Sequence, residues 1–403
     1  MSNSHEKGVR IMEKNNIDYG LKSNDFSTKH GPNGKFFAPI DPPEEGSIPI
    51  STRTELDEIR KNLSGKYHLT ADIDLSTSEW NPIGEEKNPF HGTFDGQGFE
   101  IRNLMIANYD KAYGGLFAAT SEKSLIKNVG LAGTNINSNT DVGGICARSG
   151  GDIYNCYNVG IVIGSAISSK AGGICGILFN GIISHCYNIG EVSAPSQTNM
   201  FGSRAGGICG HNNIGNVNNC FNLGKVFASG TESCAGGICG SSNEYPITNC
   251  CNTGNVSVEG VLTRAGGICG QNGIIDICYN TGEVSASGEE AAAGGIVGDA
   301  ITKVTNSYNT GKVFVSKKWS TAGGICGINT CEEVNAIDKC FNIGEVKASG
   351  DRSGAGGICG YSQGPKYTIG ACYCLDLYVS VDGILITPEE MKVAFVKAGF
   401  DIG

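Results

Sequence analysis

Ala205-Gly206-Gly207-Ile208-Cys209-Gly210 and, shortly after it, Val217-Asn218-Asn219-Cys220-Phe221-Asn222-Leu223-Gly224-Lys225-Val226 are two phrases that recur along most of the 403-residue chain. The first phrase returns as Gly-Gly-Ile-Cys, once as Gly-Gly-Ile-Val and once as Gly-Gly-Leu-Phe, and its first glycines lie 28 to 34 residues apart. Its copies occupy residues 114–117, 143–146, 172–175, 206–209, 236–239, 266–269, 294–297, 323–326 and 356–359. One narrow period identifies a repeat protein, in which each unit stacks on its neighbours to form an elongated body.

The unit 172–205 has the pattern of three short strands, at its Gly-Gly-Ile-Cys phrase, at residues 182–188 and at residues 191–194, with Gly-rich corners between them. A hairpin array would show paired Asn-Gly or Asp-Gly turns, and a leucine-rich repeat would show a Leu-rich phrase that this chain lacks. The sequence therefore predicts an all-β fold, a parallel β-helix (β-solenoid) of about nine to eleven coils. The crossover rule predicts a right-handed coil.

The chain divides into four parts. Residues 1–47 are polar and predict a flexible leader, residues 48–110 the N-terminal cap and first coils, residues 111–380 the repeat solenoid, and residues 381–403 a C-terminal capping helix. Thr54-Glu-Leu-Asp57 resembles a capping box and predicts a helix to about residue 63. Thr387-Pro-Glu-Glu390 predicts a second helix that ends near Gly399. Helices at both ends would cover the open strand edges.

Composition and charge narrow the range of partners. The net charge is −10, which disfavours nucleic acid and anionic membranes. The chain has no apolar run long enough to cross a bilayer. Residues 1–10 lack the apolar core of a secretory signal.

The N-terminal part also resembles a known family. Tyr67–Leu75, Trp80-Asn-Pro-Ile-Gly84, Gly92–Gly98 and Gly114-Gly-Leu-Phe117 resemble the start of bacterial GLUG-motif repeat proteins. The later Gly-Gly-Ile-Cys-Gly and Asn-Cys-Tyr-Asn-x-Gly-x-Val phrases are similar to the repeats of that family, and the resemblance covers residues 50–400. It implies a secreted or cell-surface protein with a β-solenoid region and no shared catalytic residues.

The cysteines follow the repeats in pairs. Seven units carry one Cys after Gly-Gly-Ile and one in the next strand: Cys146 and Cys156, Cys175 and Cys186, Cys209 and Cys220, Cys239 and Cys250, Cys269 and Cys278, Cys326 and Cys340, and Cys359 and Cys372. Two units lose both, having Phe117 with Val129 and Val297 with Ser307. The joint loss predicts that the two thiols of a unit face each other, as a disulfide in an oxidising compartment. The alternatives are reduced core thiols and, with the least support, metal sites.

Two further columns follow from the parallel stack, in which each position lies over its copy in the next coil. An asparagine ladder is predicted at Asn158, Asn188, Asn222, Asn252, Asn280, Asn309 and Asn342. An aromatic column is predicted at Tyr157, Tyr187, Phe221, Tyr279, Tyr308, Phe341 and Tyr373. Its rings either stack on each other or hold sugar rings, and the structural alternative is favoured.

No catalytic motif stands out, and no metal or cofactor is expected. Asp72, Asp74 and Asp95 are acidic residues near the N-terminal end that could serve a glycan-active β-helix enzyme or bind calcium, although capping and turn roles are the better reading. The sequence instead predicts a non-enzymatic scaffold or adhesin, secreted or at a bacterial surface, which binds a host or cell-envelope protein or glycan. A lyase or hydrolase and a purely structural spacer are the alternatives.

Overall fold

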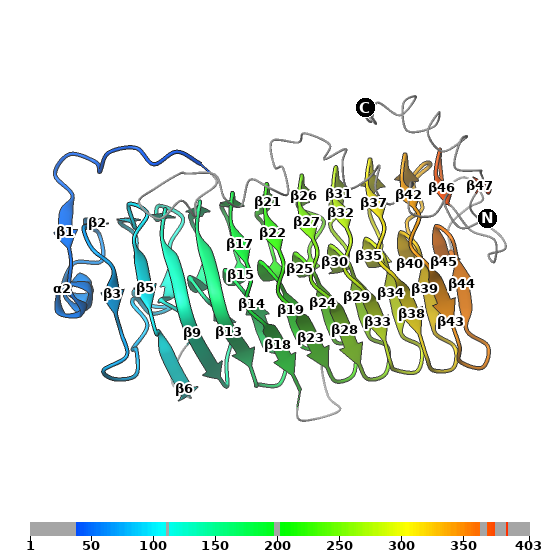
Figure 1. The fold of residues 1–403 in the computed structure, drawn as a ribbon, viewed down its shortest axis with the longest axis horizontal. Helices are drawn as coiled ribbons and strands as arrows, with labels where there is room; N and C mark the ends of the chain where they lie inside the picture. Colours follow the sequence, from blue (N-terminus) through cyan, green and yellow to red (C-terminus); the bar gives the residue numbers. More distant parts are fainter. Residues whose placement is uncertain (1–37, 110–112, 197–201, 363–368, 375–383, 386–403) are drawn as a thin grey trace, which may run out of the picture.

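The computed structural model describes residues 38–109, 113–196, 202–362, 369–374 and 384–385. These residues form a straight stack of about ten coils, and short strands of successive coils pair in parallel (Figure 1). The predicted parallel β-helix is confirmed. The helix expected over 381–403 falls outside the described residues, apart from β47 (Ile384–Leu385), which is a strand.

Four sheets run along the stack. Sheet 1 consists of β1 (Ile48–Ile50), β2 (Lys66–Leu69), β4 (Thr93–Asp95), β8 (Leu125–Lys127), β12 (Asp152–Tyr154), β16 (Ile182–Ser184), β21 (Asn216–Asn218), β26 (Pro246–Thr248), β31 (Ile274–Asp276), β36 (Val304–Thr305) and β41 (Ile337–Asp338). Sheet 2 consists of β10 (Val142–Gly143), β14 (Lys170–Gly172), β19 (Arg204–Gly206), β24 (Cys234–Gly236), β29 (Arg264–Gly266), β34 (Ala292–Gly294), β39 (Thr321–Gly323) and β44 (Gly354–Gly356).

Sheet 3 consists of β7 (Phe117–Thr120), β11 (Cys146–Ser149), β15 (Cys175–Leu178), β20 (Cys209–Asn212), β25 (Cys239–Ser242), β30 (Cys269–Gln271), β35 (Val297–Ala300), β40 (Cys326–Asn329) and β45 (Cys359–Ser362). Sheet 4 consists of β3 (Ile73–Asp74), β5 (Glu100–Arg102), β6 (Met105–Tyr109), β9 (Gly130–Ser138), β13 (Tyr157–Gly164), β17 (Tyr187–Asn188), β18 (Val192–Pro195), β22 (Phe221–Asn222), β23 (Val226–Ser229), β27 (Cys251–Asn252), β28 (Val256–Glu259), β32 (Tyr279–Asn280), β33 (Val284–Ala286), β37 (Tyr308–Asn309), β38 (Val313–Val315), β42 (Phe341–Asn342), β43 (Val346–Ala348), β46 (Tyr373–Cys374) and β47.

Each full coil has more strands than the sequence predicted. The coil that begins at Lys170 contains β14, β15, β16, β17 and β18 rather than three strands. The Gly-Gly-Ile-Cys phrase is a corner between sheets 2 and 3, not a strand. A Cβ on Gly172 would lie 1.8 Å from the carbonyl oxygen of Cys175, so only glycine permits this bend.

A short helix covers the first coil. It spans Arg53–Glu58 (α2) and continues as the 3-10 turn Ile59–Lys61 (η2), with Leu56 and Ile59 fully buried. The predicted helix is present, but its predicted start is wrong by two residues, because Thr52 is the N-cap. The Thr52 hydroxyl accepts the N–H of Glu55, and the Glu55 carboxylate accepts the N–H of Thr52 at 3.0 Å.

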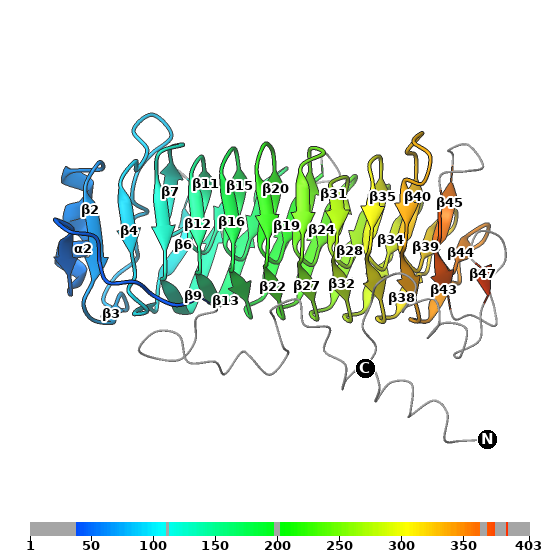
Figure 2. The ribbon, with the colours of Figure 1, turned by 90° about the horizontal axis from the view of Figure 1, so that it is seen from above.

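The end of the leader packs on the solenoid. Residues 38–47 cross the outside of the first coils as an extended segment (Figure 2). Ala38 is buried, and the Asn155 side chain accepts its N–H at 3.1 Å and donates to its carbonyl at 3.3 Å. The flexible leader predicted for 1–47 is therefore wrong for 38–47, while 1–37 lie outside the described residues.

One corner between sheets 1 and 4 uses the left-handed backbone conformation in eight successive coils. The residue before the second cysteine has a positive φ at Asn128, Asn155, His185, Asn219, Asn249, Ile277, Asn306 and Lys339. Asparagine tolerates this conformation and is the commonest residue in the column. Ile277 does not, because a β-branched side chain at φ 54° crowds the backbone.

The replacement Ile277→Asn should stabilise the protein by about 1 kcal/mol, because it removes the strain of a β-branched residue at positive φ. A higher midpoint of thermal unfolding would show it. The matched control is Asn249→Ile one coil earlier, which introduces the same strain and should lower the midpoint. A lower midpoint for Ile277→Asn would contradict the strain argument.

Candidate functional site

The predicted asparagines occupy one buried column inside sheet 4. Each side-chain Nδ2 donates to the Oδ1 of the asparagine in the next coil, at 2.8 to 3.0 Å, in all six steps from Asn158 to Asn342. From Asn188 on, the same Nδ2 also donates at 2.7 to 3.0 Å to the carbonyl of the glycine two residues later. The ladder begins at Asn158, whose Oδ1 is buried without a partner. These contacts make the column a structural element.

The aromatic column lies next to the ladder and is packed. Tyr157 and Tyr187 stack at 4.9 Å between ring centroids, Tyr279 and Tyr308 at 5.1 Å, and Phe341 and Tyr373 at 5.4 Å. Tyr157, Tyr187, Phe221 and Phe341 are buried, and Cys251 continues the column between Phe221 and Tyr279. Ile40 of the leader packs against this cluster. Ring-on-ring packing is thus what these contacts show, and the buried rings offer no face to a sugar.

The cysteines form two buried columns that run from coil to coil. Sheet 3 places Cys146, Cys175, Cys209, Cys239 and Cys269 in successive register, then Val297, Cys326 and Cys359, with Phe117 before them. In the second column Cys186 Sγ accepts the N–H of Cys156 at 3.4 Å. Ser307 takes the same place, accepting the N–H of Cys278 at 3.1 Å.

All 18 cysteines are buried free thiols. The bridges predicted within coils are therefore not formed in this structure. Parallel in-register strands bring equal positions to about 4.8 Å, so the close neighbours of each thiol belong to adjacent coils. Burial raises the pKa of Cys146 to about 12, which keeps the thiol protonated and inert. Within the described ranges, His, Cys, Asp and Glu side chains form no group of three that could hold a metal ion.

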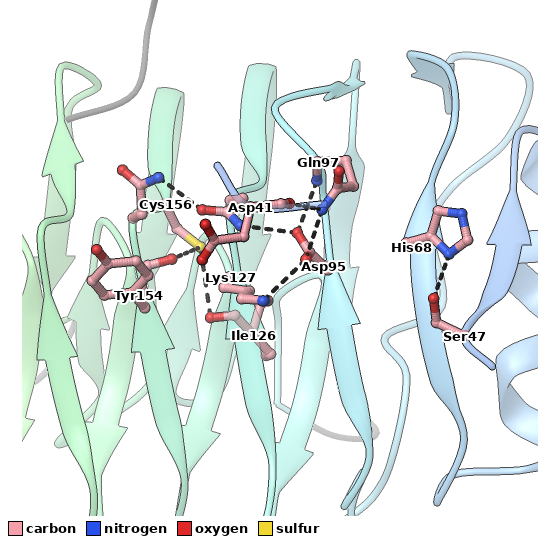
Figure 3. A network of polar contacts seen from close by, with 11 residues as sticks. Asp41, Ser47, His68, Asp95, Gln97, Ile126, Lys127, Tyr154 and Cys156 are labelled. Atoms are coloured by element: carbon pink, nitrogen blue, oxygen red, sulfur yellow. Dashed lines mark hydrogen bonds and ion pairs between the residues drawn. The ribbon is translucent and has the colours of Figure 1, made fainter. Parts of the chain in front are cut away.

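The acidic residues near the N-terminal end are each held by local partners. Asp72 forms an ion pair with Arg102 at 2.7 Å, and Asp74 accepts from the Asn103 amide at 2.9 Å. Asp95 lies between the Gln97 amide and Lys127, at 2.9 and 3.2 Å (Figure 3). These contacts are those of turns and strand ends.

A row of mainly polar side chains that the sequence analysis did not predict runs parallel to the axis, where sheets 2 and 3 meet. Sheet 2 contributes the residue two places before each first glycine, and sheet 3 the residue two places after each cysteine position. We call both columns together the axial strip. Its sheet 2 members are Asp141, Lys170, Arg204, Cys234, Arg264, Ala292, Thr321 and Gly354, and its sheet 3 members are Arg148, Ile177, His211, Ser241, Gln271, Asp299, Ile328 and Tyr361.

The two columns of the axial strip converge. Cys234 Sγ lies 3.6 Å from Gln271 Oε1, and Arg264 Nε lies 3.3 Å from Asp299 Oδ2, so outward side chains of different sheets touch. The glycine corner folds the sheets toward each other, with β19 and β20 side by side (Figure 2). The strip is therefore half-buried rather than a flat solvated face.

Positive charge gathers in the N-terminal half of the strip. Arg148 pairs with Glu86 at 2.5 Å, and its guanidinium lies over the rings of Tyr113 and Phe179 at 4.5 and 4.6 Å. Lys170 lies 3.9 Å from Asp141. Burial raises the pKa of Asp141 and lowers the pKa of Lys170, because each charge is partly removed from water.

Arg204 is a cation of the strip whose hydrogen-bonding capacity is only partly used. Its Nη1 donates to the Gly202 carbonyl at 3.3 Å, while its Nε is buried and has no hydrogen-bond partner among the described residues. His211 lies nearby and hydrogen bonds to Ser241 Oγ through Nδ1 at 2.8 Å. Burial and the charge of Arg204 lower the pKa of His211 to about 4, so the ring is neutral at pH 7.

Comparisons with known proteins add a limited context. No protein-family model matches the chain. A protein of Evansella cellulosilytica described as a Gly-rich membrane protein is 33% identical over 129 residues, which are 30% of this chain and 15% of that protein. Halomucin of Haloquadratum walsbyi is 32% identical over 125 residues, 28% of this chain and 1% of that protein. The chain thus matches only a small part of either relative.

Two solved structures also resemble the stack. A protein of Bacteroides ovatus described as an immunoglobulin A1 protease has 20% identity and a TM-score of 0.45, and the match covers 88% of each chain. A second IgA1 protease has 15% identity and a TM-score of 0.38, over 81% of this chain and 21% of the other. Among the described helices, none is long and apolar enough to span a membrane.

The replacement Asn252→Ala, in the middle of the ladder, should lower stability by about 2–4 kcal/mol, because it removes one ladder hydrogen bond from Asn222 and one from Asn280 inside the stack. Thermal and urea unfolding would measure the loss. Asn158→Ala is the matched control at the first rung, where only one ladder bond is lost. An equal loss at both positions would argue against a cooperative ladder.

The thiol columns predict that all 18 cysteines carry free thiols. If the alkylating reagent is present from lysis onward and the protein is then denatured without reductant, all 18 should be modified. Mass spectrometry would count the modified residues. Only about four reactive thiols would mean that the seven pairs within coils are bridged after all, in an oxidising compartment.

Proposed function

We propose that this chain is a non-enzymatic binding scaffold, secreted or at the cell surface, that holds an extended ligand from a host or cell envelope along the axial strip. The observation that carries the proposal is Arg204, a half-buried cation of the strip whose Nε has no hydrogen-bond partner within the part of the chain that the structure describes. A buried donor without an acceptor is unfavourable, so a ligand that supplies one would bind there.

The rigidity of the stack supports this role. The asparagine ladder and the parallel strands fix the orientation of every coil, so the strip side chains keep a constant axial spacing of about 4.8 Å per coil. Such an array is preorganised for a long ligand, which reduces the entropy lost on binding. A compact small molecule would use only one or two coils of it.

Placement outside the cell rests on two supports. The GLUG resemblance implies secretion or a surface location, and one of the relatives is described as a membrane protein. An extended stack suits a modular surface protein, in which the solenoid holds its binding strip away from the envelope.

The enzyme alternative has weaker support. Asp72, Asp74 and Asp95 are each engaged by a cation or an amide, as described above, so no free pair of carboxylates is offered for acid–base chemistry. A structural spacer remains the other alternative, and the experiment that follows separates it from a binding role.

The whole protein should bind insoluble cell-wall polysaccharide or mucin in a saturable manner without shortening either polymer. The replacement Gln271→Trp should weaken binding about tenfold or more, because a bulky ring would fill the strip beside Arg264 without changing charge. Sedimentation of the polymer and gel filtration of the glycan would measure binding and cleavage.

The matched control is Ser257→Trp, on the outward column of sheet 4, where Phe227 and Phe314 already occupy equivalent positions. It should bind like the unchanged protein. No saturable binding to any polymer would favour the spacer, and release of shortened glycan would favour the enzyme.

A further inference from the structure

The register of sheet 2 places two cations directly side by side. Lys170 and Arg204 are paired positions of β14 and β19. Like charges opposite each other on neighbouring strands are destabilising. The depressed pKa of Lys170, caused first by burial and further by Arg204 and Arg148, reflects the same unfavourable arrangement.

Acidic neighbours do not cancel this charge evenly. Asp141 lies on the far side of Lys170 at 3.9 Å, and Asp299 engages Arg264 two coils beyond Arg204. Within the described ranges, the Arg204 guanidinium donates one hydrogen bond, to the backbone carbonyl of Gly202 at 3.3 Å. A fold that keeps a half-buried guanidinium beside a lysine, with so little compensation, has the electrostatics of an anion-binding site.

We infer that the axial strip binds an acidic linear polysaccharide, whose carboxylate or sulfate groups are held by Lys170, Arg204 and Arg264. The inference rests on the proposed function and names its ligand class. Arg204 supplies the central contact, Lys170 the contact one coil before it, and Arg264 the contact two coils after it. The guanidinium of Arg204 can donate in parallel to two oxygens of one acid group.

The spacing of the cations favours a glycan over a nucleic acid. Coils are about 4.8 Å apart, so the cations along sheet 2 are separated by one coil and then by two. Duplex DNA carries one charge per ~1.7 Å of its axis, which is much denser. A polysaccharide with one acid group per sugar or per disaccharide has a sparser charge. The net charge of −10 further opposes a dense polyanion.

Aromatic side chains near the same end suit a sugar ring. Phe179 is 37% exposed and follows the sheet 3 strand β15, beside the Arg148 guanidinium. A sugar ring can pack its apolar face on such a side chain while its acid group lies toward Lys170. The strip therefore combines cations with a partly exposed ring, a combination that a free inorganic anion would not need.

The test measures binding of the full chain to polygalacturonate and to dextran sulfate by titration calorimetry at low salt, with neutral dextran and duplex DNA as comparisons. The double replacement Lys170→Met with Arg204→Gln should bind both acidic polymers about a hundredfold more weakly, roughly tenfold per cation. The matched control, Lys225→Met with Lys312→Gln, removes two exposed cations that immediately precede β23 and β38 of sheet 4, and should bind within about twofold of the unchanged protein.

Stability gives a second readout that separates a binding role from a structural one. Without ligand, the Lys170 and Arg204 double variant should unfold at the same temperature as the unchanged protein or higher, because the like-charge repulsion is gone. Polygalacturonate should raise the unfolding temperature of the unchanged protein and leave that of the variant in place.

Each of the other possible outcomes would refute a defined part of the proposal. Equal binding of neutral dextran, unaffected by the double variant, would leave a binding scaffold and refute the acidic ligand. Tighter binding of duplex DNA than of polygalacturonate would refute the ligand class, and unchanged affinity in the double variant would refute the site. A variant less stable than the unchanged protein would make the two cations structural. Failure to bind any polymer would refute the proposed function itself.

Discussion

The whole structure depends on the close approach of successive coils at glycine. Where the second phrase ends in Asn-x-Gly, a Cβ on the glycine would lie 1.6 to 2.1 Å from the carbonyl oxygen of the equivalent glycine one coil earlier, as at Gly190, Gly224 and Gly254. No side chain fits that space. The glycine column therefore fixes the register of successive coils. With the register fixed, equivalent residues of the repeats stack on each other and form columns along the axis.

This stacking of equivalent residues explains why some of the structure could be predicted from the sequence and some could not. The period alone placed Asn222 over Asn188, and a parallel stack then leaves the side chains little choice but to hydrogen bond along the axis. The same stacking applies to Cys209, whose neighbours in register are Cys175 and Cys239. The joint loss of both cysteines in one unit instead suggested a partner within the coil. Phe117 and Val297 fill one column, while Ser307 preserves the hydrogen bond of the other.

The axial strip could not be predicted from the sequence, for a different reason. Both of its columns can be read from the aligned repeats, because Lys170 and Arg204 share one position and His211 and Ser241 share another. The contact between the two columns cannot be predicted from the repeats, because it depends on the angle at the Gly-Gly corner. In one continuous strand, members of the two columns such as Lys170 and Ile177 lie seven residues apart and would point to opposite faces. Taken as a corner, the Gly-Gly-Ile-Cys phrase folds sheet 2 against sheet 3 and half-buries the charges between them.

Stability and the proposed binding role thus depend on different columns of the same coil. The inward columns of isoleucine, cysteine and asparagine supply the packing and the ladder hydrogen bonds of the fold, so the outward columns can vary without loss of the fold. In the axial strip, the residue two places before the glycines changes from Asp141 to Lys170, Arg204, Cys234 and Arg264. A purely structural position would tend toward one residue type, as the ladder does. The repulsion between two adjacent half-buried cations lowers the stability of the stack, and the rest of the fold compensates for this loss. The position of the two cations is where a ligand of opposite charge would be held.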